Sequence, residues 1–267
     1  MESARNSYCG AAGQFSKRNG CFSWVPSTSC KKTMSADTVR TASRNSGKMN
    51  LRLNEVKPLC VLMVRTLNEK HPLRFENWPA APQYEFLADS MWTDFAYGRN
   101  AVYPDGHHGN AVLSKFPIVS YDNFDISIAG PEKRGMLHCV LRIPDQALDL
   151  HVICVHLGLR EKHRQMQMKL ICEHVHSLPS DAPVVVAGDF NDWRQKANDI
   201  LGQGAGLEEV FMKTAGRLPK TFPAKRPLLC LDRIYTRNVS VGRPQVLGNQ
   251  PWSHLSDHAP LAADFHL

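Results

Sequence analysis

Two short polar motifs lie next to apolar runs in the second half of this sequence. Gly188-Asp189-Phe190-Asn191-Asp192 directly follows Val184–Ala187, and Ser256-Asp257-His258 directly precedes Ala259-Pro260-Leu261. At the end of a strand, a carboxylate can bind a hard cation or take a proton from water, and an amide can orient a nucleophile or a phosphate oxygen. Each motif taken alone also suits a turn, the first as an Asp/Asn-rich helix cap and the second as a serine-started turn with a surface histidine.

Two further residues stand out because of their neighbours. Asp232 lies within Leu231-Asp232-Arg233-Ile234-Tyr235, where a carboxylate is costly unless it is paired or binds a metal. An aspartate that accepts the proton of a histidine fixes its tautomer and raises its basicity. His156 ends the apolar run Leu148–Val155, and a single histidine at a strand end is compatible with a structural role as well as a catalytic one.

The elements that must position these residues are short and of mixed type. Runs of strand character cover Leu59–Val64, Asn110–Ile118, Leu148–Val155, Val184–Ala187, Leu228–Thr236 and Ala259–His266. A helix is expected over Arg160–Leu178, because Leu170, Ile171, Val175 and Leu178 recur at helical spacing. Strands and helices without strict βαβ alternation indicate an α/β (α+β) domain of about 200 residues, with two sheets covered by helices.

The composition excludes several classes of protein. Of 267 residues, 43% are hydrophobic and 21% are charged, which excludes a disordered, collagen-like or disulfide-miniature protein. No run of about 18 apolar residues is present, so we expect no transmembrane segment. The eight cysteines form no Cys-x-x-Cys pair, which argues against a cysteine zinc site and favours reduced thiols in a cytoplasmic protein.

The positive charge is confined to the first quarter of the chain. Residues 1–68 hold 11 Lys/Arg and 3 acids, which gives +8, so the remaining 21 Lys/Arg and 22 acids give −1. We therefore expect residues 1–57 to be a basic, poorly ordered extension and residues 58–267 to form the domain. A near-neutral domain argues against tight non-specific binding to duplex nucleic acid.

The order of the motifs carries more information than any one of them. His156, Gly188-Asp189-Phe190-Asn191, Leu231–Tyr235 and Ser256-Asp257-His258 follow one another in a way that resembles the endonuclease/exonuclease/phosphatase superfamily, with the DNase I-like fold. Gly109–Ile118 is similar to the middle motif of that family, and the resemblance covers about residues 69–267. It implies a four-layer α/β sandwich of two mixed, mostly antiparallel sheets that face each other, with helices outside.

The resemblance also implies a reaction. Family members hydrolyse phosphoester bonds with Mg²⁺ or Mn²⁺ and include nucleases, phosphodiesterases and phosphatases. It implies that Asp189 positions or deprotonates the attacking water, that Asn191 holds this water and a phosphate oxygen, and that Asp257 is a metal ligand. Mg²⁺ prefers one or two carboxylates plus water, which suits these aspartates.

The remaining site residues would surround the phosphate. By resemblance, His258, oriented by Asp232, addresses the scissile phosphate, His156 contacts another of its oxygens, and Asn110 lines the substrate groove. The resemblance does not choose between nucleic acid, a phospholipid headgroup and a sugar phosphate as substrate. We expect a monomer.

The start of the chain departs from the family pattern. The family begins with a strand ending in Tyr-Asn-Ile, and a second strand ends in Leu-Gln-Glu-Val, whose glutamate is a principal metal ligand. Neither is present: Leu62-Met63-Val64 stands at the second position, and only Glu55 and Glu69 flank it as substitutes. This first part is either a divergent replacement or the product of a shifted reading frame. The alternative function is therefore a catalytically impaired member that acts as a binding module.

Some surface features bear on the substrate. Lys162 with Arg164, and Lys220 with Lys225 and Arg226, are local basic patches that can serve an acidic substrate or simply face solvent. Three tryptophans can stack on bases or pack in the core and rim, namely Trp92, Trp193 and Trp252.

Overall fold

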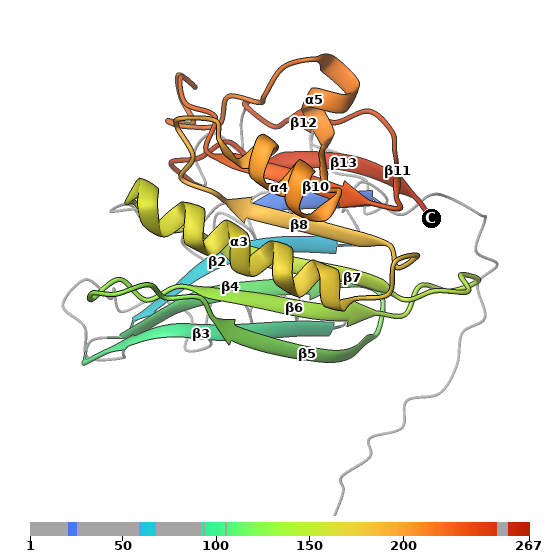
Figure 1. The fold of residues 1–267 in the computed structure, drawn as a ribbon, viewed down its shortest axis with the longest axis horizontal. Coiled ribbons are helices and arrows are strands. Elements are labelled where there is room, and N and C mark those ends of the chain that lie inside the picture. Colours follow the sequence, from blue (N-terminus) through green and yellow to red (C-terminus); the bar gives the residue numbers. More distant parts are fainter. Residues whose placement is uncertain (1–20, 26–58, 68–91, 93, 105, 250–255) are drawn as a thin grey trace, which may run out of the picture.

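The chain folds into two β-sheets with helices on the outer face of one of them (Figure 1). The structure is a computed structural model and describes residues 21–25, 59–67, 92, 94–104, 106–249 and 256–267. The first sheet has the strand order β11 (Ser240–Val241), β13 (Leu261–His266), β1 (Cys21–Val25), β2 (Leu59–Leu67), β4 (Gly106–Ser114) and β3 (Asp94–Tyr103), and β12 (Gln245–Val246) pairs with β13. The second has the order β5 (Ile118–Asp125), β6 (Gly135–Leu141), β7 (Leu150–His156), β8 (Val184–Asp189), β10 (Asp232–Arg237) and β9 (Glu208–Glu209).

Both sheets are mixed and mostly antiparallel, as expected. Each contains one parallel pair, β1 with β2 and β7 with β8, and the other pairings among the described strands are antiparallel. Buried side chains from both sheets meet in one apolar cluster, including Val112, Leu137, Val152, Val185 and Leu261. The sheets therefore pack face to face, and the predicted sandwich class is confirmed.

The helices form a second apolar layer on the outer face of the second sheet. Helices α3 (Glu161–Ser177) and α4 (Ala197–Ala205) pack on β7 and β8, and the short helix α5 (Val210–Ala215) follows β9. The helix expected over Arg160–Leu178 is confirmed as α3, and Ile171 and Val175 of its predicted apolar face are fully buried. None of the described helices is both long and apolar enough to cross a membrane.

Strand β8 carries the predicted residue Asp189 at its end. All six of its residues are buried, because β8 lies between two other strands and is covered on both faces. Gly188 has φ +152, and a Cβ at this position would lie 1.8 Å from the carbonyl oxygen of Val155 on β7. Only glycine lets the two strands approach so closely just before Asp189.

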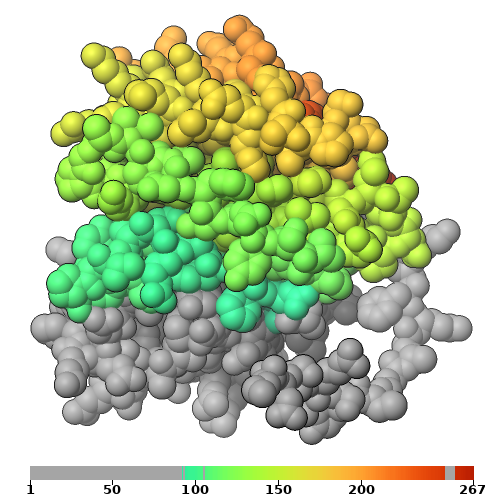
Figure 2. Space-filling view, turned by 60° about the horizontal axis from the view of Figure 1, so that its bottom comes forward, coloured from blue at the N-terminus to red at the C-terminus, as the bar shows by residue number. Residues whose placement is uncertain are grey.

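Two expectations about the strands need correction. The run predicted as one strand over Asn110–Ile118 is divided, because β4 ends at Ser114 and Ile118 begins β5 in the other sheet. Ser114 Oγ accepts a hydrogen bond from the Phe116 backbone N–H, which stabilises the turn between them. Strands β3 and β5 then lie beside each other at the margin of the sandwich, below α3 in the space-filling view (Figure 2).

The second correction concerns the strand expected over Leu228–Thr236, because β10 begins only at Asp232 and Leu229 forms an isolated bridge with Phe222.

The N-terminal segment contributes a strand to the first sheet. Cys21–Val25, which fall within the expected extension, form strand β1 between β13 and β2 in the first sheet. The other residues of segment 1–57 lie outside the described residues, as do Glu69 and Trp252. The boundary at residue 58 stays a prediction.

Candidate active site

Three site residues lie in one row across neighbouring strand ends. His156 at the end of β7 is opposite Asp189 at the end of β8, and Asp189 is opposite Asp232 at the start of β10. Residues paired in this way present their side chains on the same face of the sheet. Backbone hydrogen bonds continue past the strands, since Leu157 N–H donates to Asp189 O at 2.9 Å. The fold therefore brings together three predicted residues that are up to 76 positions apart in the sequence (232 − 156).

The other sheet contributes His258, from the loop before β13. Its Nδ1 lies 2.7 Å from Oδ2 of Asp232, which has no exposed surface. The backbone N–H of Asp232 donates to Thr221 Oγ1 at 3.3 Å, and the Phe222 ring lies 4.8 Å from the His258 ring. Thr221 thus fixes the backbone at Asp232, and the imidazole of His258 contacts both the Asp232 carboxylate and the Phe222 ring.

The pairing with Asp232 determines the protonation state of the His258 imidazole. Burial disfavours the imidazolium, but the carboxylate of Asp232, its hydrogen bond, and the charges of Asp189 and Asp257 outweigh burial and raise the pKa of His258 to about 9. At neutral pH His258 is therefore a cation with its second nitrogen, Nε2, turned away from Asp232. Such a group can donate to an anionic oxygen.

Asp189 and His156 are the other two residues of the row. Burial, and then the charge of Asp232, raise the pKa of Asp189 to about 7. Oδ2 of Asp189 lies 3.6 Å from Nε2 of His156. Burial, followed by the charges of Arg134 and His108, holds the pKa of His156 well below its usual value, so this imidazole is neutral. A carboxylate with a pKa near 7 is matched to proton transfer at neutral pH.

Asn191 lies beyond the strand rather than on it. Its backbone is left-handed, with φ 48, a conformation that asparagine adopts more readily than most residues. Its N–H donates to Asp189 Oδ1 at 2.8 Å, and its Nδ2 donates to the Leu157 carbonyl at 2.9 Å. Asn191 therefore fixes the Asp189 carboxylate, and one of its amide hydrogens is already engaged.

Asn110 is the residue expected to line the substrate groove, and that role stays a prediction. It is fully buried, and its Nδ2 donates to the carbonyls of Gly135 at 2.8 Å and Cys154 at 3.0 Å. Its Oδ1 has no hydrogen-bond partner among the described residues. Asn110 thus joins β4 of one sheet to β6 and β7 of the other.

The donor set fits a hard divalent cation in type but not in number. Asp189, Asp232 and Asp257 supply carboxylate oxygens, which Mg²⁺ and Mn²⁺ prefer, and the mutual repulsion of Asp189 and Asp232 would be relieved by a cation. Among the residues described, however, no three His, Cys, Asp or Glu side chains are grouped to hold a metal ion. Strand β2, which pairs with β4, stands where the family pattern would carry the glutamate that binds the metal, but its sequence LCVLMVRTL contains no acid. A cation bound by these residues would have water molecules as most of its ligands.

Arg134 is a site residue that the motifs did not single out. Its Nε donates to the Leu157 carbonyl at 3.2 Å, the same oxygen that Asn191 contacts, and its Nη2 pairs with Glu132 at 2.7 Å. Its charge acts on both Asp189 and His156. The one feature of the sequence that could have indicated Arg134 is its position immediately before Gly135, where β6 begins beside β7.

The chain matches known proteins over most of its length. A model of the Endonuclease/Exonuclease/phosphatase family matches residues 51–258. "Uncharacterized protein YbhP" of Escherichia coli (strain K12) is 57% identical over 209 residues, which are 78% of this chain and 83% of that protein.

Solved structures with low sequence identity share the fold. An endonuclease/exonuclease/phosphatase from Beutenbergia cavernae has a TM-score of 0.68 at 17% identity, covering 94% of this chain and 72% of that one. A mannosyl-6-phosphatase from Bacteroides thetaiotaomicron has a TM-score of 0.64 at 16% identity, covering 92% and 100%. TDP2 of D. rerio, complexed with a single-strand DNA product, has a TM-score of 0.63 at 16% identity, covering 92% and 99%.

Proposed function

Because this chain belongs to the endonuclease/exonuclease/phosphatase family, we propose that it hydrolyses phosphoester bonds, phosphodiesters among them, with the help of a divalent cation. The observation that carries the proposal is the row formed by His156, Asp189 and Asp232, completed by the bond from His258 to Asp232. Structures that share the fold include a mannosyl-6-phosphatase and a TDP2 complexed with a single-strand DNA product, which supports phosphoester chemistry without selecting a substrate.

Asp189 is the group that takes the proton of the attacking water. Burial and Asp232 raise its pKa to about 7, so it is a stronger base than an exposed aspartate and is still largely ionised just above neutral pH. Asn191 holds its Oδ1 through a backbone hydrogen bond, which leaves Oδ2, on the side of His156, to face water. The proton moves from the water oxygen to Asp189 as this oxygen bonds to phosphorus and the bond between phosphorus and the ester oxygen breaks, so that the ester oxygen leaves with the bonding electron pair.

Three side chains bind the phosphate oxygens. His258 contributes an imidazolium N–H whose charge is maintained by Asp232, and His156 contributes an N–H from a neutral ring. Arg134 adds a guanidinium that is fixed by Glu132 and the Leu157 carbonyl. Because these donors are held before substrate arrives, they can stabilise the charge that builds on the phosphoryl oxygens during the reaction.

A divalent cation would be held by Asp257, with water completing its coordination. When bound, it would neutralise phosphate charge and stabilise the leaving oxygen. The alternative is that the site binds a phosphoester without turnover, and the lack of an acid on β2 is the observation that favours it.

Four cysteines are free thiols, namely Cys139, Cys154, Cys172 and Cys230, which supports placing the protein in the reducing cytoplasm.

The test measures the phenol that the full chain releases from an aryl phosphodiester and from an aryl phosphomonoester. Each ester is tested with Mn²⁺, with Mg²⁺ and with a chelator. Metal-dependent turnover of either ester is the expected result. Folded protein that binds the ester without turnover would establish the binding-module alternative instead.

A further inference from the structure

The three loops that carry the active-site row share a feature that the reaction itself does not require. In each loop an exposed large apolar side chain stands close to an exposed Lys or Arg. After β7 these are Leu159, 57% exposed, and Arg160; after β8 they are Trp193, 44% exposed, and Arg194; before β10 they are Arg226 and Leu228, 68% exposed. Single exposed apolar residues are ordinary on a protein surface, but the same pairing in three loops around one site is a pattern.

The loop before β10 is a tight hairpin fixed against the catalytic residues. The N–H groups of Thr221 and Phe222 donate to the Leu229 carbonyl at 2.8 and 3.1 Å, and Leu228 N–H donates back to Phe222 O at 2.8 Å. Its Ala224 N–H donates to the carbonyl of Asp257 at 2.6 Å. The hairpin therefore holds its exposed leucines, Leu228 and Leu229, and the cations of its turn beside the site rather than elsewhere on the surface.

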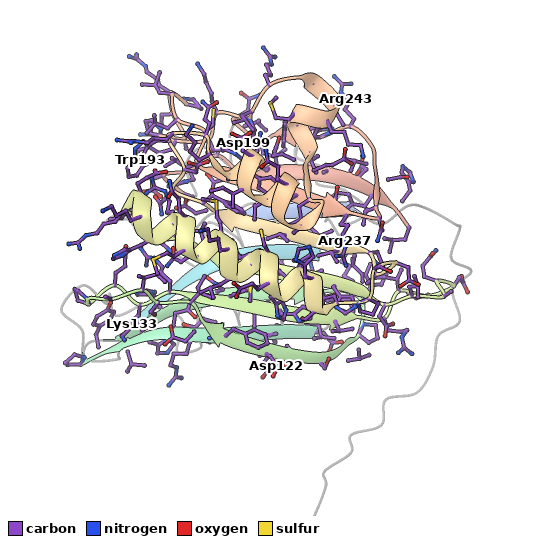
Figure 3. All side chains as sticks on the ribbon, viewed as in Figure 1. Asp122, Lys133, Trp193, Asp199, Arg237 and Arg243 are labelled. Carbon is purple, nitrogen blue, oxygen red and sulfur yellow. The ribbon has the colours of Figure 1, made fainter. Side chains whose placement is uncertain are left out.

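The other two loops are joined through Arg164. Its guanidinium lies 4.1 Å from the centre of the Trp193 ring, and its Nη1 donates to the carbonyls of Gly158 at 3.2 Å and Leu159 at 2.5 Å. Arg164 is fully buried, so Trp193 is supported from below while its outer face stays exposed. Figure 3 shows Trp193 at the end of the sandwich where β8 ends and α3 begins, well away from Arg243.

Charge is concentrated around the hairpin. Residues 210–231 contain five cations and no acid, whereas residues 69–267 as a whole have a net charge of −1. Lys213 pairs with Glu208, so the other four cations carry the charge of this surface. The five cations are Lys213, Arg217, Lys220, Lys225 and Arg226. A surface that combines leucine and tryptophan with Lys and Arg has the composition that binds the interface of an anionic bilayer, where apolar side chains enter the headgroup region and cations meet lipid phosphates.

We propose that these three loops dock the protein onto an anionic phospholipid surface, so that a phosphoester of a lipid headgroup reaches the row formed by His156, Asp189 and Asp232. The choice of substrate class rests on the proposed function, but the docking does not. A nucleic acid would also meet the cations, yet exposed Leu228 and Leu229 would gain little from phosphate contacts, which are electrostatic. The two leucines therefore favour the lipid surface.

The test is co-sedimentation of the full chain with vesicles of phosphatidylcholine alone or mixed with phosphatidylglycerol. Wild type is expected to sediment with the anionic vesicles only. The pairs Leu228→Ser/Leu229→Ser and Lys225→Glu/Arg226→Glu are each expected to weaken this partition at least tenfold, by loss of apolar insertion and of charge attraction respectively. Melting temperatures establish that each variant is folded.

Matched controls lie away from the site. Leu148→Ser removes an exposed leucine between β6 and β7, at the opposite ends of these strands, and Arg243→Glu reverses an exposed charge. Both are expected to partition within twofold of wild type. Equal loss in the controls, or binding to a single-stranded oligonucleotide without binding to anionic vesicles, would overturn the docking proposal. Turnover of a soluble aryl phosphodiester is measured separately, so vesicle binding without turnover would contradict the proposed function and not the docking.

Discussion

Oδ2 of Asp232 lies 2.7 Å from Nδ1 of His258, and this contact helps to join the two sheets of the sandwich at the candidate active site. The aspartate begins β10 of one sheet, and the histidine immediately precedes the last strand of the other. Because Asp232 is fully buried, its charge is little screened by solvent, and His258 is its direct partner. The pair is therefore both an interaction between the sheets and the source of the positive charge at His258.

Replacing Asp232 with asparagine keeps the shape of the side chain and removes its charge. His258 then loses its imidazolium character and its fixed orientation, so kcat/KM should fall by at least about 100-fold. His258→Ala should cause a similar loss, and the double variant should be little worse than either single one, because the two residues act as a unit. Fully additive losses in kcat/KM would show that they act independently.

Arg134→Gln tests the residue that the motifs did not reveal. Losing a charged donor to a phosphate oxygen should lower kcat/KM by about 10- to 100-fold, since a hydrogen bond to a charged group contributes about 1.5–3 kcal/mol. The neighbouring Lys133 is exposed, and Lys133→Gln is the matched control, expected to change kcat/KM less than twofold. Similar kcat/KM losses in both variants would point to a general charge effect instead.

Asp257→Asn tests the assignment of the metal ligand without relying on turnover. A cation that binds the folded chain raises its melting temperature with increasing concentration. We expect Mn²⁺ to stabilise wild type, and we expect the variant to need about 10- to 100-fold more Mn²⁺ for the same shift. An unchanged Mn²⁺ response in Asp257→Asn would remove Asp257 from the ligand set.

Three neighbouring histidines should make the free energy of unfolding depend on pH. His138 on β6 lies 2.9 Å from His151 and 3.1 Å from His174, measured between ring nitrogens. Burial, followed by the charges of His174 and His151, lowers the pKa of His138 to about 3, and burial also lowers the pKa of the other two. Nearby charges are Asp122, Asp149 and Arg237.

The neutral form of His138 is the one that the folded state favours. The resulting stability is complete above the unfolded pKa, near 6.5, and is lost as pH falls from there toward 3, with a slope of about 1.4 kcal/mol per pH unit for His138. Urea unfolding between pH 7.5 and 5 should show this slope in wild type and a smaller one in His138→Leu. The exposed His176 supplies the control, and a slope equally reduced in His176→Gln would contradict the assignment.

Because the family motifs keep their order along the chain, the sequence could name residues that the fold brings together, among them His156, Asp189 and Asp232. The apolar setting of Asp232 indicated that it needs a partner, and the structure supplies His258. The burial of Asn110 could not be read from its motif, because it depends on carbonyls that β6 and β7 bring from the other sheet. Strand β1 escaped prediction because CFSWV lies in a basic, polar segment, and its pairing with β2 and β13 depends on residues far along the chain.

Hydrolysis of an aryl phosphodiester by the full chain with Mn²⁺, compared with that by Asp189→Asn, decides whether Asp189 is the base of a hydrolase. Removing the base should lower the rate by about 100- to 10,000-fold, while the melting temperature holds or rises, because an ionised carboxylate no longer has to be buried. Asp199→Asn, at an exposed position on α4 labelled in Figure 3, is the matched control and should keep the wild-type rate. Turnover at the wild-type rate in folded Asp189→Asn, or its absence in folded wild type with Mn²⁺, would contradict the account.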